Sequence, residues 1–95
     1  MGIVDYKLIE KESIASLSFP KNEILRDKND FKQLVSDLER VTILGNGANI
    51  KVDLFFEDNK NKYVVNTTVW GITDTAIILK QGVVIPINRI IKVSY

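Results

Sequence analysis

The feature that most limits how this chain can fold is a series of short alternating segments in its second half. From position 50 to position 56 every second residue is apolar: Ile50, Val52, Leu54 and Phe56. This period of two is typical of a strand that buries one face. The polar residues 58–62 then predict a turn. Residues 63–70 are rich in β-branched and aromatic side chains and predict a second strand.

Three more strands are predicted after these two, at residues 75–80, 83–87 and 90–95. A Gln-Gly turn separates the first two of them, and a short polar break precedes the last. Gly71 predicts a bend or bulge. Pro86 has no N–H to donate, so it belongs at a sheet edge or a strand end. Five short strands joined by tight turns predict a small closed antiparallel barrel, SH3/Sm-like, over about residues 49–95.

A helix is predicted over about residues 30–41. Its apolar residues follow helical spacing and form one stripe: Phe31, Leu34, Val35, Leu38 and Val41. Asn29 or Asp30 is expected to cap the start of the helix. Gly45-Asn46-Gly47 is expected to prevent helical structure from continuing further along the chain. The stripe can pack on an open end of the barrel or meet a partner protein, and the pattern leaves both alternatives open. A partner would then contact an apolar face made of Phe31, Leu34, Leu38 and Phe55.

Apolar residues also alternate in the first twenty positions, at Val4, Tyr6 and Leu8 and again at Ala15, Leu17 and Phe19. They predict a β-hairpin that turns near residues 11–13. Together with the barrel and the helix, this hairpin gives an α+β fold. A chain of 95 residues has the length for one core, so we expect a single domain over residues 1–95.

The composition argues against an enzyme. The chain has no cysteine and no histidine, which excludes a thiolate nucleophile, a zinc site built on these residues and a Ser-His-Asp triad. Its carboxylates do not fall at catalytic spacing, and it has no phosphate-binding glycine loop. We therefore predict no catalytic residue, no metal ligand and no cofactor.

The charge balance and the apolar runs indicate where such a protein acts. Thirteen basic and twelve acidic residues give a net charge of +1, which is not that of a strongly basic nucleic-acid binder. Unbroken apolar runs are four residues or shorter, and the N-terminus lacks the features of a signal peptide. We expect a cytoplasmic protein without a membrane partner. The many Ile, Lys and Asn residues are typical of AT-rich genomes and favour a phage or mobile-element origin.

The sequence of residues 69–95 is VWGITDTAIILKQGVVIPINRIIKVSY. It resembles the Sm-like small barrel, which has a bent strand with a central Gly, a hairpin, and two last strands joined by a one-turn link. The ending from Ile85 to Val93 is also similar to that of the YolD-like proteins of low-GC bacteria. In Sm-like proteins the one-turn link carries basic and polar residues that bind RNA. The resemblance therefore implies an RNA contact at residues 87–90.

Five residues are candidate contacts for a nucleic acid or another partner: Trp70, Lys80, Asn88, Arg89 and Lys92. The three basic ones would form a small patch if turns and strand ends gather at one rim, although scattered, solvated cations are more common. Trp70 is expected in the core, because Trp is usually well buried. An exposed Trp70 would instead stack on a base or anchor a partner.

Two functions remain. The first is a small non-enzymatic regulatory protein that acts through protein–protein contacts with an unknown partner protein, which the balanced charge and the apolar stripe favour. The alternative is an Sm-like protein that binds RNA or single-stranded nucleic acid, which the resemblance favours. Either would be able to form homo-oligomers through an edge strand, at Val83–Ile87 or Ile90–Tyr95.

Overall fold

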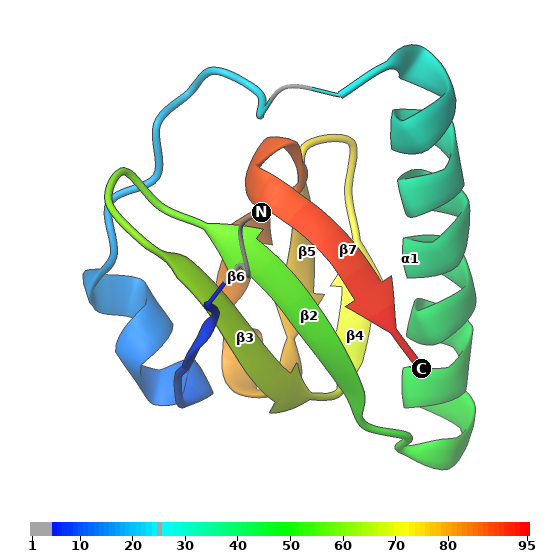
Figure 1. The fold of residues 1–95 in the computed structure, drawn as a ribbon. Helices are drawn as coiled ribbons and strands as arrows, with labels where there is room; N and C mark the ends of the chain where they lie inside the picture. Colours follow the sequence, from blue (N-terminus) through cyan, green and yellow to red (C-terminus); the bar gives the residue numbers. More distant parts are fainter. Residues whose placement is uncertain (1–4, 25) are drawn as a thin grey trace.

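The computed structural model describes residues 5–24 and 26–95, and in these ranges the chain forms an α-helix, seven strands and three short 3-10 helices (Figure 1). The helix is α1 (Lys28–Ala48). The strands are β1 (Lys7–Leu8), β2 (Val52–Glu57), β3 (Lys62–Thr67), β4 (Val69–Ile72), β5 (Ala76–Leu79), β6 (Val84–Pro86) and β7 (Ile90–Ser94). The 3-10 helices are η1 (Lys11–Ser16), η2 (Lys80–Gly82) and η3 (Ile87–Arg89). The predicted α+β class is confirmed.

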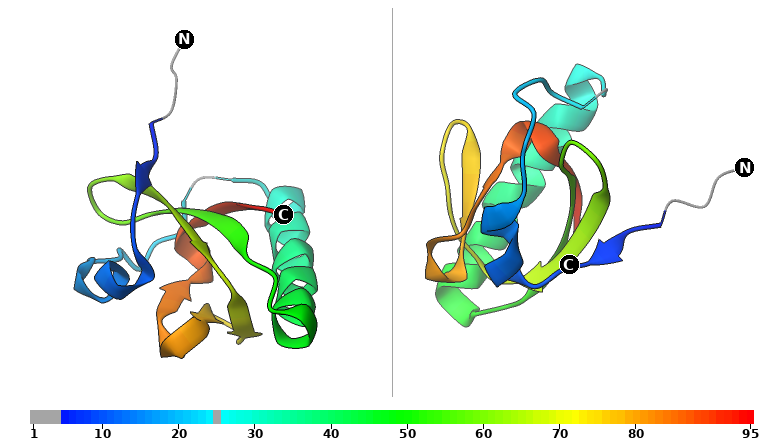
Figure 2. Two further views of the ribbon diagram at one scale, coloured as in Figure 1. Left: turned by 90° about the horizontal axis from the view of Figure 1, so that it is seen from below. Right: turned by 90° about the vertical axis from the view of Figure 1, so that its left-hand side faces the viewer.

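The strands form two sheets rather than the predicted closed barrel. One sheet has the order β1-β3-β2-β7 and the other the order β4-β5-β6. The strand predicted at residues 63–70 breaks at Thr68, where the chain passes from the first sheet to the second. The register shifts between Val69 and Gly71, which is the bulge predicted there. The right-hand view of Figure 2 shows the two sheets on opposite sides, with α1 behind both.

The barrel prediction fails at β6 and β7, which do not pair. β6 is three residues long and ends in Pro86, which cannot donate to a ladder, as the sequence predicts for a strand end. The chain then turns through η3 before β7 begins. Within the described ranges, β6 and β7 are thus outer strands of different sheets.

The predicted N-terminal hairpin is also wrong. Residues 7 and 8 pair in parallel with Tyr63 and Val64 of β3, and η1 takes the place of the expected turn and return strand. The reason is Ile14, which the 3-10 geometry turns into the core, where it is almost completely buried. Val4, part of the predicted alternation, lies outside the described residues.

The helix is longer than predicted at both ends. Asp27, rather than Asn29 or Asp30, is its N-cap, and its Oδ1 accepts a hydrogen bond from the Asp30 N–H at 2.8 Å. The helix runs through Gly45-Asn46-Gly47 to Ala48, and its C-cap Asn49 adopts a left-handed conformation with φ of 54°. The predicted stop fails because Gly45 is a packing residue. Nowhere in the described part of the chain is a helix both long and apolar enough to cross a membrane.

The core lies between the two sheets and α1. Leu34, Leu38 and Val41 of the helix are buried. They join one cluster with apolar residues from both sheets: Val52, Leu54, Phe56, Val65, Val69, Ile77, Leu79, Ile85 and Ile90. The helical stripe therefore packs on the strands, as one of the two sequence alternatives expects.

The helix lies very close to β4 at one point. A Cβ atom on Gly45 would overlap the carbonyl oxygen of Val69 and lie 2.9 Å from Cγ2 of Thr68. One residue on, Nδ2 of Asn46 donates to the carbonyl oxygens of Thr42 and Trp70, both at 3.0 Å. α1 therefore covers carbonyl groups of an outer strand that would otherwise lack partners.

This close contact predicts opposite effects of the same substitution at two glycines of α1. We expect Gly45→Ala to lower the free energy of unfolding by about 1–3 kcal/mol, because the new methyl group meets backbone that cannot move aside. Gly47 has nothing within 4 Å of the added Cβ, so Gly47→Ala should raise stability by about 0.5–1 kcal/mol through helix propensity. Urea denaturation compares the two variants, and equal stability would contradict the packing described.

Candidate functional site

Arg89 is a structural residue and not a surface cation. Its side chain is 7% exposed. Nη2 donates to Glu57 Oε1 at 3.1 Å and to the Asp58 carbonyl at 3.3 Å, and Nη1 donates to the Asn22 carbonyl at 2.9 Å. These bonds join η3 to the β2–β3 turn and to the segment before α1. The guanidinium predicted to contact RNA is thus occupied within the fold.

Asn88 is also engaged within the protein. Its Nδ2 donates to the Lys21 carbonyl at 2.6 Å, and its own carbonyl accepts from the Ile24 N–H at 3.1 Å. Arg26 Nη2 adds hydrogen bonds to the carbonyl oxygens of Ile87 and Asn88, at 3.4 and 3.3 Å. The segment before α1 therefore holds η3 in place, and the predicted RNA-binding link is part of an internal contact.

The remaining candidate contacts are not brought together into a basic patch. Lys80 lies in η2, at the opposite end of β6 from Arg89. Lys92 lies on β7 beside Phe55 of β2, with its Nζ 4.8 Å from the ring centroid, and Tyr6 packs edge-on against the same ring at 4.8 Å. Lys92 and Phe55 are both predicted site residues. They lie on neighbouring strands, and the structure places them in contact.

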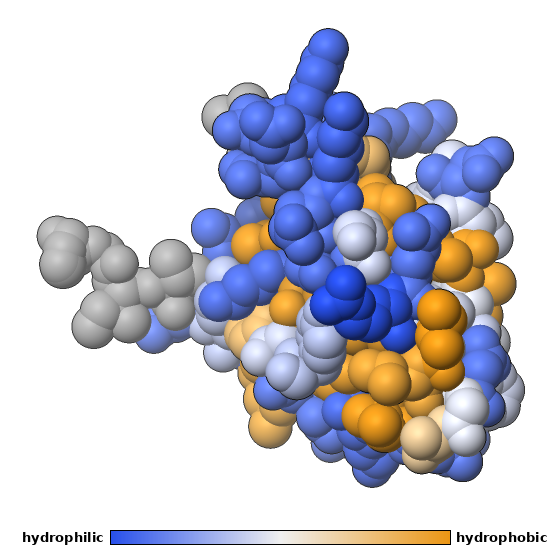
Figure 3. Space-filling view, turned by 90° about the vertical axis from the view of Figure 1, so that its right-hand side faces the viewer, coloured by the Kyte–Doolittle hydropathy of each residue, from blue (hydrophilic) through white to orange (hydrophobic). Residues whose placement is uncertain are grey.

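Trp70 is 43% exposed, so the expectation that it lies in the core is wrong. It lies at the β4 bulge, where Val69 takes the buried position. Other apolar side chains are exposed near the C-terminal end of α1, among them Ile43 and Ile50. Figure 3 shows the α1 side of the molecule, with hydrophilic side chains toward the N-terminal end of the helix and apolar ones toward its C-terminal end.

The predicted apolar partner face does not exist as one surface. Leu34 and Leu38 are buried in the core, and Phe31 is partly buried beneath the Arg26 guanidinium, which lies 5.5 Å from its ring centroid. Phe55 belongs to β2, on the four-stranded sheet. A helix face offered to a partner would need these side chains to be accessible together.

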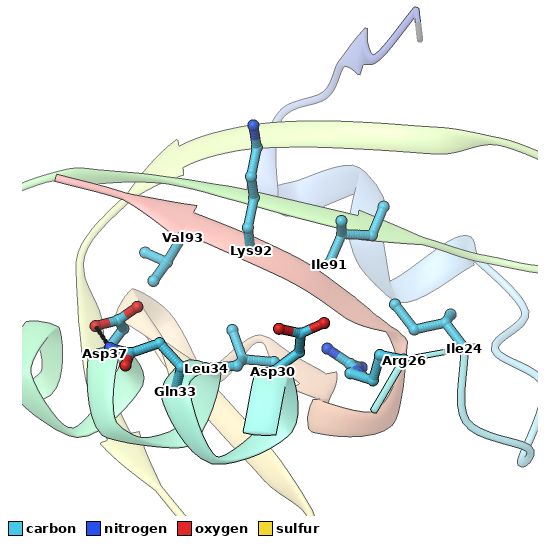
Figure 4. A pocket seen from close by; sticks show the side chains of 9 residues that line it. All are labelled: Ile24, Arg26, Asp30, Gln33, Leu34, Asp37, Ile91, Lys92 and Val93. Carbon is cyan, nitrogen blue, oxygen red and sulfur yellow. Dashed lines mark hydrogen bonds between the residues drawn. The ribbon is translucent and has the colours of Figure 1, made fainter. Parts of the chain in front are cut away.

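A groove of about 350 Å³ lies between the N-terminal half of α1 and β7 (Figure 4). Apolar side chains from the helix, from β7 and from the preceding segment line it: Ile24, Leu34, Ile91 and Val93. Polar side chains complete its walls: Arg26, Asp30, Gln33, Asp37 and Lys92. Sequence reasoning missed this groove, because no local pattern reveals that β7 passes beside the first half of α1.

Hydrogen bonds hold the α1 wall of the groove in place. Asp37 Oδ1 accepts from Gln33 Nε2 at 3.0 Å and from the Tyr95 hydroxyl at 3.4 Å. Arg26 Nε lies 3.1 Å from Glu23 Oε2 at the other end. The groove thus has fixed polar groups above an apolar floor.

Beside this wall, β7 has one edge without a strand partner. Among the described residues it pairs with β2 alone, and α1 rather than another strand lies on its other side. Such an edge carries backbone N–H and C=O groups that can pair with another chain. The groove and the strand edge together form the candidate binding site.

A second hollow, of about 410 Å³, lies between the segment before α1 and the end of β6. Its apolar lining residues are Phe19, Pro20, Phe31, Ala76, Pro86 and Ile87. Pro86 removes a backbone donor from this edge, so it is the poorer place for a strand to add. In residues 5–24 and 26–95 no group of three or more Cys, His, Asp or Glu side chains is placed to hold a metal ion.

Comparison of the chain with protein-family models, with curated proteins and with solved structures found no match.

Asp58 provides a pH-dependent contribution to the stability of the β2–β3 turn. Burial disfavours its charged form, but N–H groups of Asn61 and Lys60 and the Tyr63 hydroxyl donate to the carboxylate at 2.7, 2.8 and 3.3 Å. These donors outweigh burial and lower the pKa of Asp58 below its ordinary value.

Because the folded pKa lies below the unfolded value of about 3.9, this contribution is present at neutral pH and is lost as the pH falls through the folded pKa. We expect Asp58→Asn to cost about 1–2 kcal/mol at pH 7 and to lose less further stability than the wild type on acidification below about pH 4. Urea denaturation between pH 7 and pH 2.5 measures both effects, and parallel pH curves for the two proteins would contradict this assignment.

Proposed function

We propose that this protein is a non-enzymatic binding module that holds a segment of a partner protein in the groove between α1 and β7. The observation that carries the proposal is the β7 edge without a strand partner beside an apolar-floored groove. An extended segment can add to such an edge through main-chain hydrogen bonds, and the pockets beside it then select side chains.

The shape of the groove supports a polypeptide ligand. Its volume of about 350 Å³ is at the low end of small-molecule sites, which are usually more enclosed. Here the groove lies between a helix and a strand (Figure 4), and the Tyr95 hydroxyl, just after β7, joins α1 at the Asp37 end. A segment of a few residues would be able to lie along it beside β7.

We further propose that the domain is related in architecture to Sm-like small barrels, without closure. A strand bent at Thr68, the β4–β5 hairpin and the one-turn link η3 between the last two strands support this relation. RNA or single-stranded nucleic-acid binding is the second candidate function. It is favoured by the contact of Tyr6, Phe55 and Lys92 on the outside of the four-stranded sheet, because aromatic and cationic groups together suit base stacking.

The first experiment selects ligands for the protein from a library of displayed random 12-residue peptides and measures the affinity of the selected peptides. We expect Gln33→Trp, which places a large side chain in the groove, to weaken their binding at least tenfold. Ser36→Trp is the matched control on the same helix, since Ser36 is exposed and does not line the groove. Binding that is equal in the two variants would contradict the proposed function.

Self-association through β7 would fill the same groove. Light scattering of the wild type and of Gln33→Trp separates this case. If the wild type and Gln33→Trp are both monomers, the β7 edge is free for a partner protein. A dimer that Gln33→Trp dissociates would make a second copy the occupant and would overturn the proposal of a different partner.

The nucleic-acid candidate makes a separate prediction. If it holds, a short single-stranded RNA should bind at low salt, should lose affinity steeply as salt rises, and should bind at least fivefold more weakly to Lys92→Glu. Lys80→Glu, in η2 directly after β5 of the other sheet, is the control. Arg89 is unsuitable for this test, because its substitution would disturb the fold. If fluorescence anisotropy detects no RNA binding at low salt, this candidate function is eliminated.

A further inference from the structure

The wall of the groove formed by α1 carries an ordered pattern of charge. Asp30, Leu34 and Asp37 lie at positions i, i+4 and i+7 of the helix, and all three line the groove. Residues at this spacing share one helix face. Along the groove this wall therefore carries Asp30, then Leu34 with the polar Gln33 beside it, then Asp37 (Figure 4).

The basic side chains at the groove are already engaged. Arg26 is paired with Glu23 and also donates to carbonyl groups of η3. Lys92 extends away from α1 and lies over an aromatic ring of β2. In contrast, neither Asp30 nor Asp37 forms a salt bridge in the part of the chain that the structure describes. The groove therefore offers two carboxylates that form no salt bridge among the described residues. Arg26 lies beside Asp30 (Figure 4) but is held by Glu23 and η3. Asp37 accepts hydrogen bonds from the uncharged Gln33 and Tyr95 side chains.

We infer that the segment bound in this groove is an extended strand with basic, apolar and basic side chains at positions i, i+2 and i+4. The inference rests on the proposed function and names its partner: a protein segment with alternating cationic and apolar residues. The basic side chains would pair with Asp30 and Asp37, and the apolar one would contact Leu34.

The side-chain spacing of an extended strand and that of α1 are compatible with this arrangement. Side chains of a strand alternate between its faces, so residues i, i+2 and i+4 would all point toward α1. They span about 13 Å at roughly 3.3 Å per residue. Asp30 and Asp37 are seven residues apart, which is about 10 Å along the helix at 1.5 Å per residue. The long, flexible side chains of Lys and Arg can close a difference of a few ångströms at the two ends.

The apolar floor of the groove determines which type of residue the bound segment needs at position i+2. Leu34 lies between the two carboxylates at the bottom of the groove, where it is 5% exposed, and Val93 faces it from β7, whereas Ile24 lies at the far end beyond Arg26. A Val, Ile or Leu side chain would lie against Val93 and the exposed edge of Leu34. A charged residue at this position would lose its hydration without gaining a partner.

The test uses the same displayed library and asks which pattern is selected. For the wild type we expect enrichment of peptides with Lys or Arg at i and i+4 and Val, Ile or Leu at i+2. Asp30→Asn combined with Asp37→Asn should weaken a selected peptide about threefold to tenfold, as expected for two partly exposed ion pairs. The control removes the same charge elsewhere, with Glu39→Gln on α1 and Asp74→Asn in the β4–β5 turn, and should change affinity less than twofold.

Exchanging the charge of the two carboxylates distinguishes a loss of specific contacts from a loss of folding. We expect Asp30→Lys combined with Asp37→Lys to select peptides with Glu or Asp at i and i+4, because a gain of the opposite preference cannot come from an unfolded protein. Methylation of alternate peptide amides tests the strand geometry. One alternating set should abolish binding, and the other should leave it nearly unchanged.

The outcomes separate the inference from the function on which it rests. Selected peptides that Gln33→Trp blocks, but that show no basic pattern or keep the same pattern after the charge exchange, would overturn the inference and leave the proposed function standing. Peptides that Gln33→Trp does not affect, or a selection that yields no binder, would overturn both.

Discussion

The arrangement of this domain depends on the close contact between α1 and β4. Gly45 lets the helix approach the Val69 carbonyl without a side chain between them, and Asn46 provides a donor for the Trp70 carbonyl. The helix thereby covers one edge of the three-stranded sheet while its apolar stripe closes the core. Because α1 is anchored at its C-terminal half, its N-terminal half is left beside β7 with a groove between them.

A second contact fixes the other wall of that groove. Arg89 and Asn88 tie η3 to the segment that leads into α1, and β7 begins directly after η3. The start of the helix and the start of β7 are therefore held by the same set of hydrogen bonds. A groove between two elements positioned in this way is preorganised, which lowers the entropic cost of binding an extended chain.

The sequence predicted the elements better than their assembly. Alternation predicts β2, β3 and β7, turn residues delimit β5 and β6, and the stripe at Phe31, Leu34 and Leu38 predicts the helix, because these patterns are local. The closed barrel and the N-terminal hairpin failed because they depend on long-range pairing, which alternation does not specify. Gly45-Asn46-Gly47 predicts a helix stop, although the small size of Gly45 serves a contact with a strand that begins more than twenty residues later. The groove was missed for the same reason, since its walls come from distant parts of the chain.

The most direct test of the proposed function is hydrogen exchange of the backbone amides of β7, measured by NMR in the free protein and with a selected peptide bound. An edge strand exposes alternate N–H groups, so in the free protein alternate amides of Ile90–Ser94 should exchange rapidly. The account predicts that these amides become protected on binding, together with shifts at the N-terminal half of α1. Protection confined to β6, or to the face that carries Phe55 and Lys92, would contradict it.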